Sequence, residues 1–118
     1  MGAIFIANYP RPADNNYKFD MDYYLKVHMP LQLKHHKPYG MRSYHVIQPE
    51  KETPYGTSPY VVQTIEFWDS VEGFFKALKE ASQEPSDDIP KYTDIKAPFP
   101  IIGEIKGSWV DSTFELKH

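Results

Sequence analysis

The residues best suited to acid/base chemistry lie between positions 19 and 30. Tyr24 and His28 are four residues apart, a spacing that places both side chains on one face of a helix. The imidazole of His28 can exchange protons near neutral pH, because its ordinary pKa is about 6.5. The phenol of Tyr24 or Tyr23 can donate a hydrogen bond to the same ligand. The spacing therefore indicates His28 as a catalytic acid or base, with Tyr24 as its catalytic partner.

Pro30 offers His28 a second, purely structural role. A proline inside a helix lacks an N–H donor and crowds the preceding turn, so we expect it to kink or interrupt this helix. The break would free backbone carbonyls, and the ring nitrogens of His28 can bond them. Asp20 is expected to cap the start of the same helix. The spacing alone is compatible with either role for His28.

His45 is a weaker candidate for the same site. It falls in the middle of a predicted strand, on the face that alternation also assigns to Met41, Ser43 and Ile47. If the helices cover that face, His45 can meet His28 and bind the same ligand. The alternative is a partly buried polar residue with no role in the site.

Other kinds of functional motif are missing from the sequence. There is no cysteine, and no His-x-His or His-x-x-x-His spacing, so neither a metal site nor any cofactor is predicted. No Gly-x-Ser-x-Gly elbow and no Gly-x-Gly-x-x-Gly loop is present. The formal net charge is −3 and no run of Lys or Arg forms a basic stripe, which argues against a nucleic-acid partner.

Six predicted elements position these residues. They are a strand at 3–9, a helix at 20–36 broken at Pro30, strands at 41–48 and 60–68, a helix from 71 that ends before Pro85, and a strand within 99–110. The order β-α-β-β-α-β is typical of the ferredoxin-like split, an α+β fold with a four-stranded antiparallel sheet.

Large aromatic side chains are frequent, with nine Tyr and seven Phe. In the second predicted helix, Val71, Phe74, Phe75 and Leu78 have the spacing of a buried stripe. Most aromatics are expected to belong to the core, and some to line a pocket for a flat or apolar ligand. Trp68 and Phe75 are our candidates for that ligand-binding role.

The two predicted helices can cover only one face of the predicted sheet, so the other face stays open. Apolar residues point to both faces of its strands, as in Val61-Val62 and Ile101-Ile102. The uncovered face must then be buried against a partner. We therefore expect a homodimer in which the sheets of two copies face each other.

The run from Phe19 to Pro30 reads Phe-Asp-x-x-Tyr-Tyr-x-x-x-His-x-Pro. This run resembles the signature of the EthD-like proteins, which are named for a gene linked to the degradation of ethyl tert-butyl ether. The resemblance extends over most of the chain, including a Gly-led second strand and a third strand ending in Phe67-Trp68-Asp69. It implies a dimeric α+β barrel, whose relatives often bind their ligand between the sheet and its helices.

By this motif, His28 and Tyr24 are the implied pocket residues, with Tyr23 and Asp20 beside them. The resemblance implies a small enzyme, because relatives include monooxygenases of antibiotic biosynthesis, muconolactone isomerase-like enzymes and fungal enzymes that tailor aromatic polyketides. The first hypothesis is a cofactor-independent lyase or oxidoreductase of secondary metabolism, acting on an apolar or aromatic metabolite. Two alternatives stay open: a non-catalytic dimeric binding protein for a small hydrophobic ligand, and a haem-linked oxidoreductase with His28 or His45 as axial ligand.

The chain length of 118 residues fits a single domain. We assign residues 1–110 to it and residues 111–118 to a C-terminal tail. The apolar run at the N-terminus is too short for a signal sequence or a membrane span, so no membrane partner is predicted. The absence of cysteine is compatible with the cytoplasm, where we expect the protein.

Overall fold

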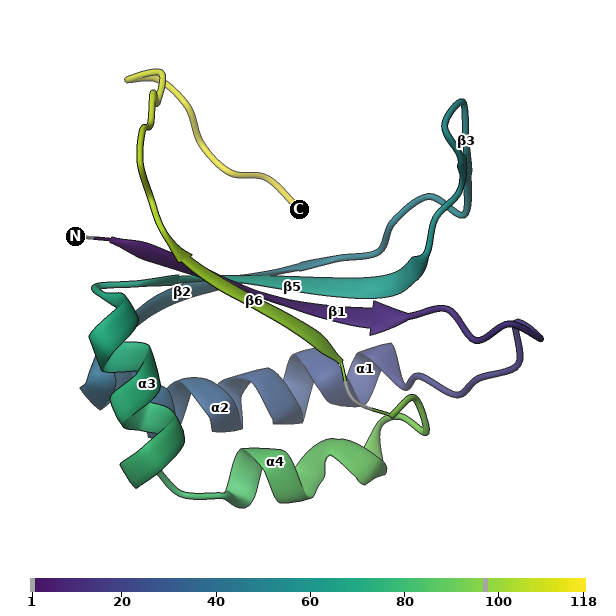
Figure 1. Cartoon of the computed structure of the whole chain (residues 1–118), viewed down its shortest axis with the longest axis horizontal. Helices are drawn as coiled ribbons and strands as arrows, with labels where there is room; N and C mark the ends of the chain where they lie inside the picture. Colours follow the sequence, from purple (N-terminus) through teal and green to yellow (C-terminus); the bar gives the residue numbers. More distant parts are fainter. Residues whose placement is uncertain (1, 97) are drawn as a thin grey trace.

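A computed structural model describes residues 2–96 and 98–118. Four strands form one antiparallel sheet in the order β2-β5-β1-β6. Their bounds are Ala3–Pro10 for β1, Met41–Ile47 for β2, Tyr60–Trp68 for β5 and Phe99–Glu104 for β6. The predicted α+β class and ferredoxin-like order are confirmed (Figure 1).

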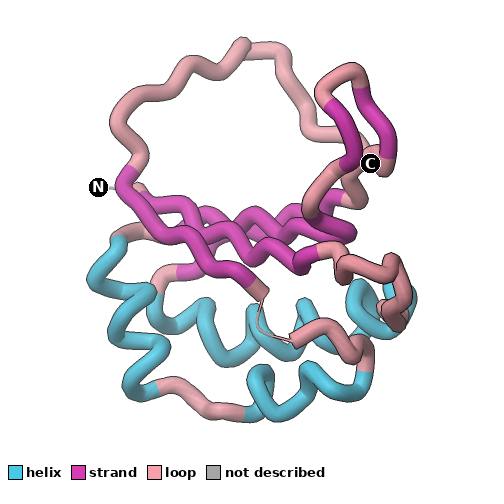
Figure 2. The backbone as a smooth tube through the Cα atoms, turned by 45° about the vertical axis from the view of Figure 1, so that its right-hand side comes forward, coloured by secondary structure: helices cyan, strands magenta, loops and turns pink. Residues whose placement is uncertain are grey.

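All helices lie on one face of this sheet (Figures 1 and 2). The first helical segment runs without a break through α1 (Met21–Tyr23), the π-helical turn η1 (Tyr24–His28), α2 (Met29–His36) and the 3-10 turn η2 (Lys37–Tyr39). The second segment comprises α3 (Val71–Glu80), followed by α4 (Glu84–Asp88) and the 3-10 turn η3 (Ile89–Lys91). A separate small hairpin pairs β3 (Glu52–Thr53) with β4 (Gly56–Thr57).

Alternation along β1 divides the sheet into a helix-covered face and an open face. Ala3, Ala7 and Tyr9 are buried beneath the helices, and Phe5 stacks on Phe74 of α3 with ring centroids 4.7 Å apart. The strand partners of these residues share their face. The helix-covered face therefore carries the hydrophobic core of the molecule.

The open face takes the alternate positions of each strand. We define it by Ser43, His45 and Ile47 of β2, Gln63, Ile65 and Phe67 of β5, Ile4, Ile6 and Asn8 of β1, and Phe99, Ile101 and Gly103 of β6. Ile47, Phe67, Phe99 and Ile101 are all exposed on it. The predicted uncovered, apolar sheet face is therefore present in the isolated chain.

The predicted alternation of the second strand is wrong at its start. The strand register shifts between Met41 and Ser43, so these residues do not share a face. Met41 is fully buried with the helices, whereas Ser43 and His45 lie on the open face. The extra residue at the bulge is the physical reason, because it reverses the alternation that precedes it.

The predicted buried stripe of α3 is only partly correct. Phe74 and Ala77 are buried, but Phe75 is 52% exposed and Leu78 is 57% exposed. The helix lies at one end of the sheet, so only a narrow side of it meets the core (Figure 1). Gly73 makes this approach possible, because a Cβ there would lie 2.4 Å from the Tyr39 backbone oxygen.

The last strand, predicted within 99–110, spans Phe99–Glu104, so Trp109 and Val110 lie outside it. Residues 105–118 leave the sheet on the side opposite to the helices (Figure 1). Within residues 2–96 and 98–118, no helix has the length and apolar character that crossing a bilayer requires.

Candidate functional site

A π-helical turn directly before Pro30 sets the positions of Tyr24 and His28. The Met29 N–H donates to the Tyr24 carbonyl, five residues back, which closes a wider turn than an α-helix has. The predicted break is therefore absent: the chain stays helical through Pro30, and the wide turn accommodates the proline. Such turns occur frequently at functional sites.

The turn stacks the two predicted residues on each other. The rings of Tyr24 and His28 lie 5.3 Å apart with an interplanar angle of 13°. Tyr92, which follows η3, packs against both rings. Its ring centroid lies 4.7 Å from that of Tyr24 and 4.5 Å from that of His28. The imidazole is only 3% exposed. The sequence prediction that both side chains point inward is correct.

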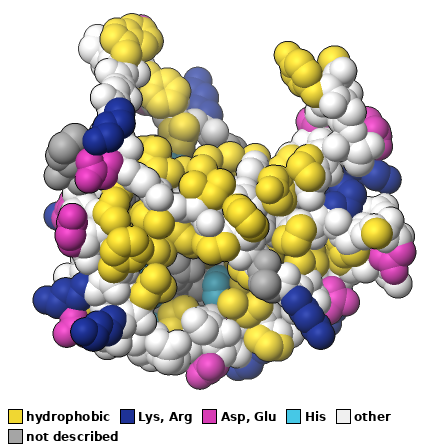
Figure 3. Space-filling view, viewed as in Figure 1, with side chains coloured by type: hydrophobic (Ala, Val, Ile, Leu, Met, Phe, Trp, Pro, Cys, Tyr) yellow, Lys and Arg dark blue, Asp and Glu magenta, His cyan; other side chains and the backbone are white. Residues whose placement is uncertain are grey.

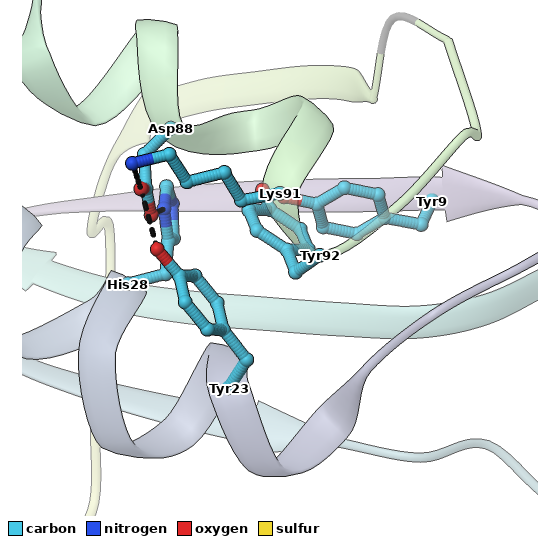
Figure 4. Close-up of polar contacts among 6 residues, drawn as sticks. All are labelled: Tyr9, Tyr23, His28, Asp88, Lys91 and Tyr92. Atoms are coloured by element: carbon cyan, nitrogen blue, oxygen red, sulfur yellow. Dashed lines mark hydrogen bonds and ion pairs between the residues drawn. The ribbon is translucent and has the colours of Figure 1, made fainter.

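Asp88, at the end of α4, is the polar partner of His28 (Figure 4). His28 Nδ1 lies 3.1 Å from Asp88 Oδ2, and the pair is buried. The Tyr23 hydroxyl donates to Asp88 Oδ1 at 2.7 Å. Lys91 Nζ lies 3.8 Å from the same oxygen. The ring nitrogen thus meets a carboxylate rather than a backbone carbonyl freed by Pro30.

The electrostatics of this pair favour a neutral imidazole beside an ionised carboxylate. Burial lowers the pKa of His28 below 6.5, although the bond to Asp88 acts in the opposite direction. Burial disfavours ionisation of Asp88, but hydrogen bonds from Tyr23 and His28 outweigh it and lower the pKa of Asp88. At neutral pH Nδ1 therefore carries the proton and donates it to Asp88. The lone pair is then on Nε2, which has no hydrogen-bond partner among the described residues.

Tyr24 is held within a cluster of phenols. Its hydroxyl and Thr64 Oγ1 are 2.6 Å apart, and the hydroxyls of Tyr9 and Tyr92 are also 2.6 Å apart. Burial raises the pKa of Tyr24 well above 10, so the phenol stays protonated. Its hydrogen bond to Thr64 fixes the wall against which the imidazole stacks.

The remaining predicted site residues do not gather around His28. Asp20 caps α1 by accepting the Tyr23 N–H at 3.0 Å. His45 lies on the open face, where Nε2 is 3.1 Å from Ser43 Oγ. Phe75 is half exposed on the outside of α3. These three residues lie on different elements, and within the described part of the chain none of them forms a hydrogen bond with His28.

Trp68 forms a hydrogen bond with a second buried carboxylate, Glu66, which was not among the predicted site residues. Its indole N–H donates to Glu66 Oε1 at 3.0 Å, and Gln32 donates to Glu66 Oε2 at 2.5 Å. Glu66 is 1% exposed, and burial raises its pKa to about 7. It shares the helix-covered face of β5 with Thr64.

Sequence reasoning missed Asp88, because it lies in a polar, proline-rich stretch and 60 residues from His28 in the chain. The stretch from Asp88 to Tyr92 reads Asp-Ile-Pro-Lys-Tyr, a pattern that spacing rules do not assign to a site. Glu66 could have been found, because it alternates with Thr64 and Trp68 in the clearest predicted strand.

Two shallow cavities are found elsewhere on the molecule. One of about 330 Å³ lies beside the β3–β4 hairpin and includes Arg11 and Lys51. The other, of about 340 Å³, lies on the open face and includes Ile4, Ile6 and Ile101. Neither is lined by His28. Figure 3 shows a hollow between the sheet and the helices, with a histidine side chain visible inside it.

The described part of the chain has no cluster of three His, Asp, Glu or Cys side chains able to hold a metal ion. His36 Nδ1 is its only fully enclosed side-chain nitrogen or oxygen that lacks a hydrogen-bond partner. At His28 the described residues bring together one imidazole, one carboxylate and the Tyr23 hydroxyl.

Two solved structures share this arrangement of elements. An EthD-like protein from Ralstonia eutropha JMP134 is 26% identical, with a TM-score of 0.77 over 92% of this chain and 95% of that chain. A protein of the ethyl tert-butyl ether degradation (EthD) family from Bacillus halodurans C-125 is 23% identical, with a TM-score of 0.59 over 89% and 99%.

The chain has the EthD-like fold. The resemblance found in the Phe19 to Pro30 motif is thereby confirmed over nearly the whole chain. A candidate monooxygenase from Shewanella loihica PV-4 shares the fold at 14% identity, with a TM-score of 0.54 over 92% of this chain and 97% of that chain. No protein-family model matches the sequence, and no curated protein matches it significantly. The EthD-like fold does not define a reaction, so function must be argued from the site.

Proposed function

We propose that this EthD-like chain is a small enzyme that transfers a proton on an apolar or aromatic metabolite, with His28 as its base. The observation that supports this most directly is the buried contact of 3.1 Å between His28 Nδ1 and Asp88 Oδ2. A carboxylate that accepts the Nδ1 proton keeps the basic lone pair on Nε2 and stabilises the imidazolium that forms.

The proposed step needs no cofactor. Nε2 takes a proton from an acidic C–H of the substrate, and the electron pair of that bond forms a double bond as a leaving group departs. The imidazolium, paired with Asp88, then returns its proton to the leaving group. Elimination follows this course directly. In a cyclisation the freed electron pair attacks a carbonyl carbon of the substrate, and the imidazolium protonates the alkoxide that forms. A decarboxylation uses the imidazolium only as an acid: it protonates the carbanion left as CO2 departs, and the ring then regains its proton from water. The aromatic rings of Tyr24 and Tyr92 favour a flat substrate beside the imidazole.

The polar groups around the base support roles in positioning. Tyr23 donates to the Asp88 oxygen that His28 does not use, which fixes the plane of the carboxylate. Tyr24 keeps its proton and forms the stacking wall, so its part in the proposal is to orient the imidazole. The predicted role of Tyr24 in polarising a substrate oxygen would require its hydroxyl to leave Thr64.

The proposal includes a homodimer formed through the open face. Ile101 is 48% exposed there and Phe99 is 59% exposed, which is unfavourable in water. Sheets of equal size can cover each other face to face in a two-fold symmetric pair. The dimer leaves the helix-covered face of each copy, with His28, on the outside of the pair.

A flat aromatic compound with an acidic C–H tests the base directly. The probe is 5-nitrobenzisoxazole, whose ring opens when a base removes its single acidic proton, giving a coloured phenolate. We expect the purified protein to accelerate this reaction and His28→Gln to lower the rate by about 100-fold or more. His45→Gln is the matched control, because it removes a partly buried histidine from the other face, and it should keep the wild-type rate.

Circular dichroism must show that His28→Gln stays folded before its rate is compared. If the folded variant turns over the probe as fast as wild type, His28 is not the base. If wild type and His45→Gln both fail to accelerate the reaction at any accessible pH, the proton-transfer proposal fails with this class of substrate.

A non-catalytic binding protein is the second candidate, and the low exposure of the His28 ring favours it. In that case the Asp88–His28 pair joins α4 to the first helical segment and has no chemical role. The protein would then retain a small hydrophobic ligand without converting it. Native mass spectrometry shows whether 5-nitrobenzisoxazole stays bound, but its ring-opened product has the same mass. The absorbance of the coloured phenolate therefore separates the two candidates, because a binding protein retains the probe without forming this product.

A further inference from the structure

The C-terminal segment, residues 105–118, has apolar side chains without a place to bury them. Trp109 is 83% exposed, Val110 70%, Phe114 59% and Leu116 57%. The Ile105 N–H donates to the Gly2 carbonyl at 2.9 Å. Beyond it, the described residues provide no backbone hydrogen bond between residues 106–118 and the rest of the chain. A large aromatic side chain left in water at this level loses most of its hydrophobic stabilisation.

This segment and the β3–β4 hairpin stand on the same side of the sheet, opposite to the helices (Figures 1 and 2). The strand register places them at opposite ends, because Ala3 pairs with Glu104 at one end and Pro10 with Tyr60 at the other. At the turn of the hairpin, Tyr55 is fully exposed. The open face is thus the floor of a trough between two projecting arms.

The floor of this trough carries no Asp, Glu, Lys or Arg among the twelve residues that define the open face. Charged residues are depleted in the cores of protein interfaces and frequent on ordinary surface. Figure 3 shows the hydrophobic side chains continuing across this face between the two arms. At the foot of the C-terminal arm, a shallow cavity of about 340 Å³ is bordered by Ile4, Ile6 and Ile101 on the floor and by Glu104 and Lys106 at its edge.

We infer that residues 105–118 form an arm that packs its apolar side chains, with Trp109 as the main anchor, onto the sheet of a second copy of this chain. This inference rests on the proposed dimer. In a face-to-face pair, the C-terminal arm of each copy lies beside the open face of the other copy. The apolar side chains of the arm then meet a surface that is also apolar and uncharged. The predicted loosely held tail would then be part of the interface.

The reach of the arm is sufficient. Its fourteen residues span up to about 46 Å when extended. The outer strands of a four-stranded sheet lie about 14 Å apart. The arm can therefore cross the whole face of the second copy. A second copy fits better than an unrelated partner, because a two-fold pair satisfies both arms and both open faces at once.

Light scattering coupled to size-exclusion chromatography over a range of protein concentrations tests the arm. The variants are a chain that ends at Gly107 and the full chain with Trp109→Glu. We expect each to raise the dimer dissociation constant by about tenfold or more, as loss of a central aromatic anchor does. Leu78→Glu is the control, since Leu78 is also an exposed apolar residue, at 57%, but lies on the helical side, and it should dimerise as wild type does.

The outcomes separate the arm from the dimer and from catalysis. If wild type is a dimer and both variants dimerise equally well, the arm inference is overturned while the face-to-face dimer stands. If wild type is a monomer at every concentration, arm and dimer both fail, and the His28 rate comparison is unaffected. Should the shortened chain lose its fold by circular dichroism, Trp109→Glu alone decides, because it changes one exposed side chain.

Discussion

The two faces of the four-stranded sheet differ in the burial and the hydrogen bonding of their side chains. On the helix-covered face, polar groups are buried and paired, as with Tyr24 to Thr64 and Trp68 to Glu66. On the open face, apolar side chains such as Phe67 and Ile101 remain exposed, and no charged residue is present. The two faces therefore differ in kind: one holds paired, buried polar groups, and the other presents uncharged apolar side chains to the outside.

This division also explains why His28 and His45 differ despite their shared residue type. His28 is enclosed and linked to a carboxylate, so its protonation is set by its surroundings. His45 sits beside Ser43 and meets the edge of the Phe67 ring at 5.8 Å. A histidine acquires a defined role here through its partner and its burial rather than through its presence alone.

The largest expected effect comes from placing a charge on the open face. In a symmetric pair, Ile101→Asp puts two carboxylates into an apolar interface, where unpaired charges cost several kcal/mol. We expect loss of the dimer at micromolar concentration with the monomer still folded, because Ile101 is 48% exposed in the isolated chain. Sedimentation velocity checks this. If the Ile101→Asp protein sediments as wild type does, the open face is not the dimer interface.

A smaller effect should come from Glu66 on the covered face. Burial raises its folded pKa to about 7, whereas the unfolded value is near 4.5. The folded state therefore holds the proton more tightly, and stability falls as the pH rises from about 4.5 to 7. Over this range the loss is about 3 kcal/mol from Glu66 alone. Urea unfolding at several pH values measures it.

Glu66→Gln sharpens this test, because glutamine cannot ionise and still accepts the Trp68 N–H. The variant should lose less stability than wild type between pH 4.5 and 7. Equal pH dependence of the two proteins would mean that Glu66 is not a buried titrating group.

The sequence predicted the elements and the inward-facing helix residues, because these depend on short-range periodicity. The four-residue spacing of Tyr24 and His28 was enough to place them together. The strands alternate clearly, so their order and the uncovered face followed from pattern alone. The helix around Pro30 was harder, since a π-helical turn is decided by packing rather than by the proline itself.

Long-range pairing could not be predicted from the same patterns. Asp88 lies 60 residues from His28 in the chain, and only the packing of α4 on the first helical segment joins them. The bulge between Met41 and Ser43 moved His45 to the open face, and alternation has no means to anticipate an extra residue. Phe75 has the spacing of a buried residue, but α3 meets too little of the sheet to cover it.

The central claim is that Asp88 holds His28 as a neutral base with its lone pair on Nε2. Long-range proton–nitrogen NMR of the ¹⁵N-labelled protein, assigned by comparison with His28→Gln, reports the state of this ring directly. We predict a proton on Nδ1 alone at pH 7, with titration only below pH 6.5. A ring that carries both protons at pH 7, or a single proton on Nε2, would contradict the account.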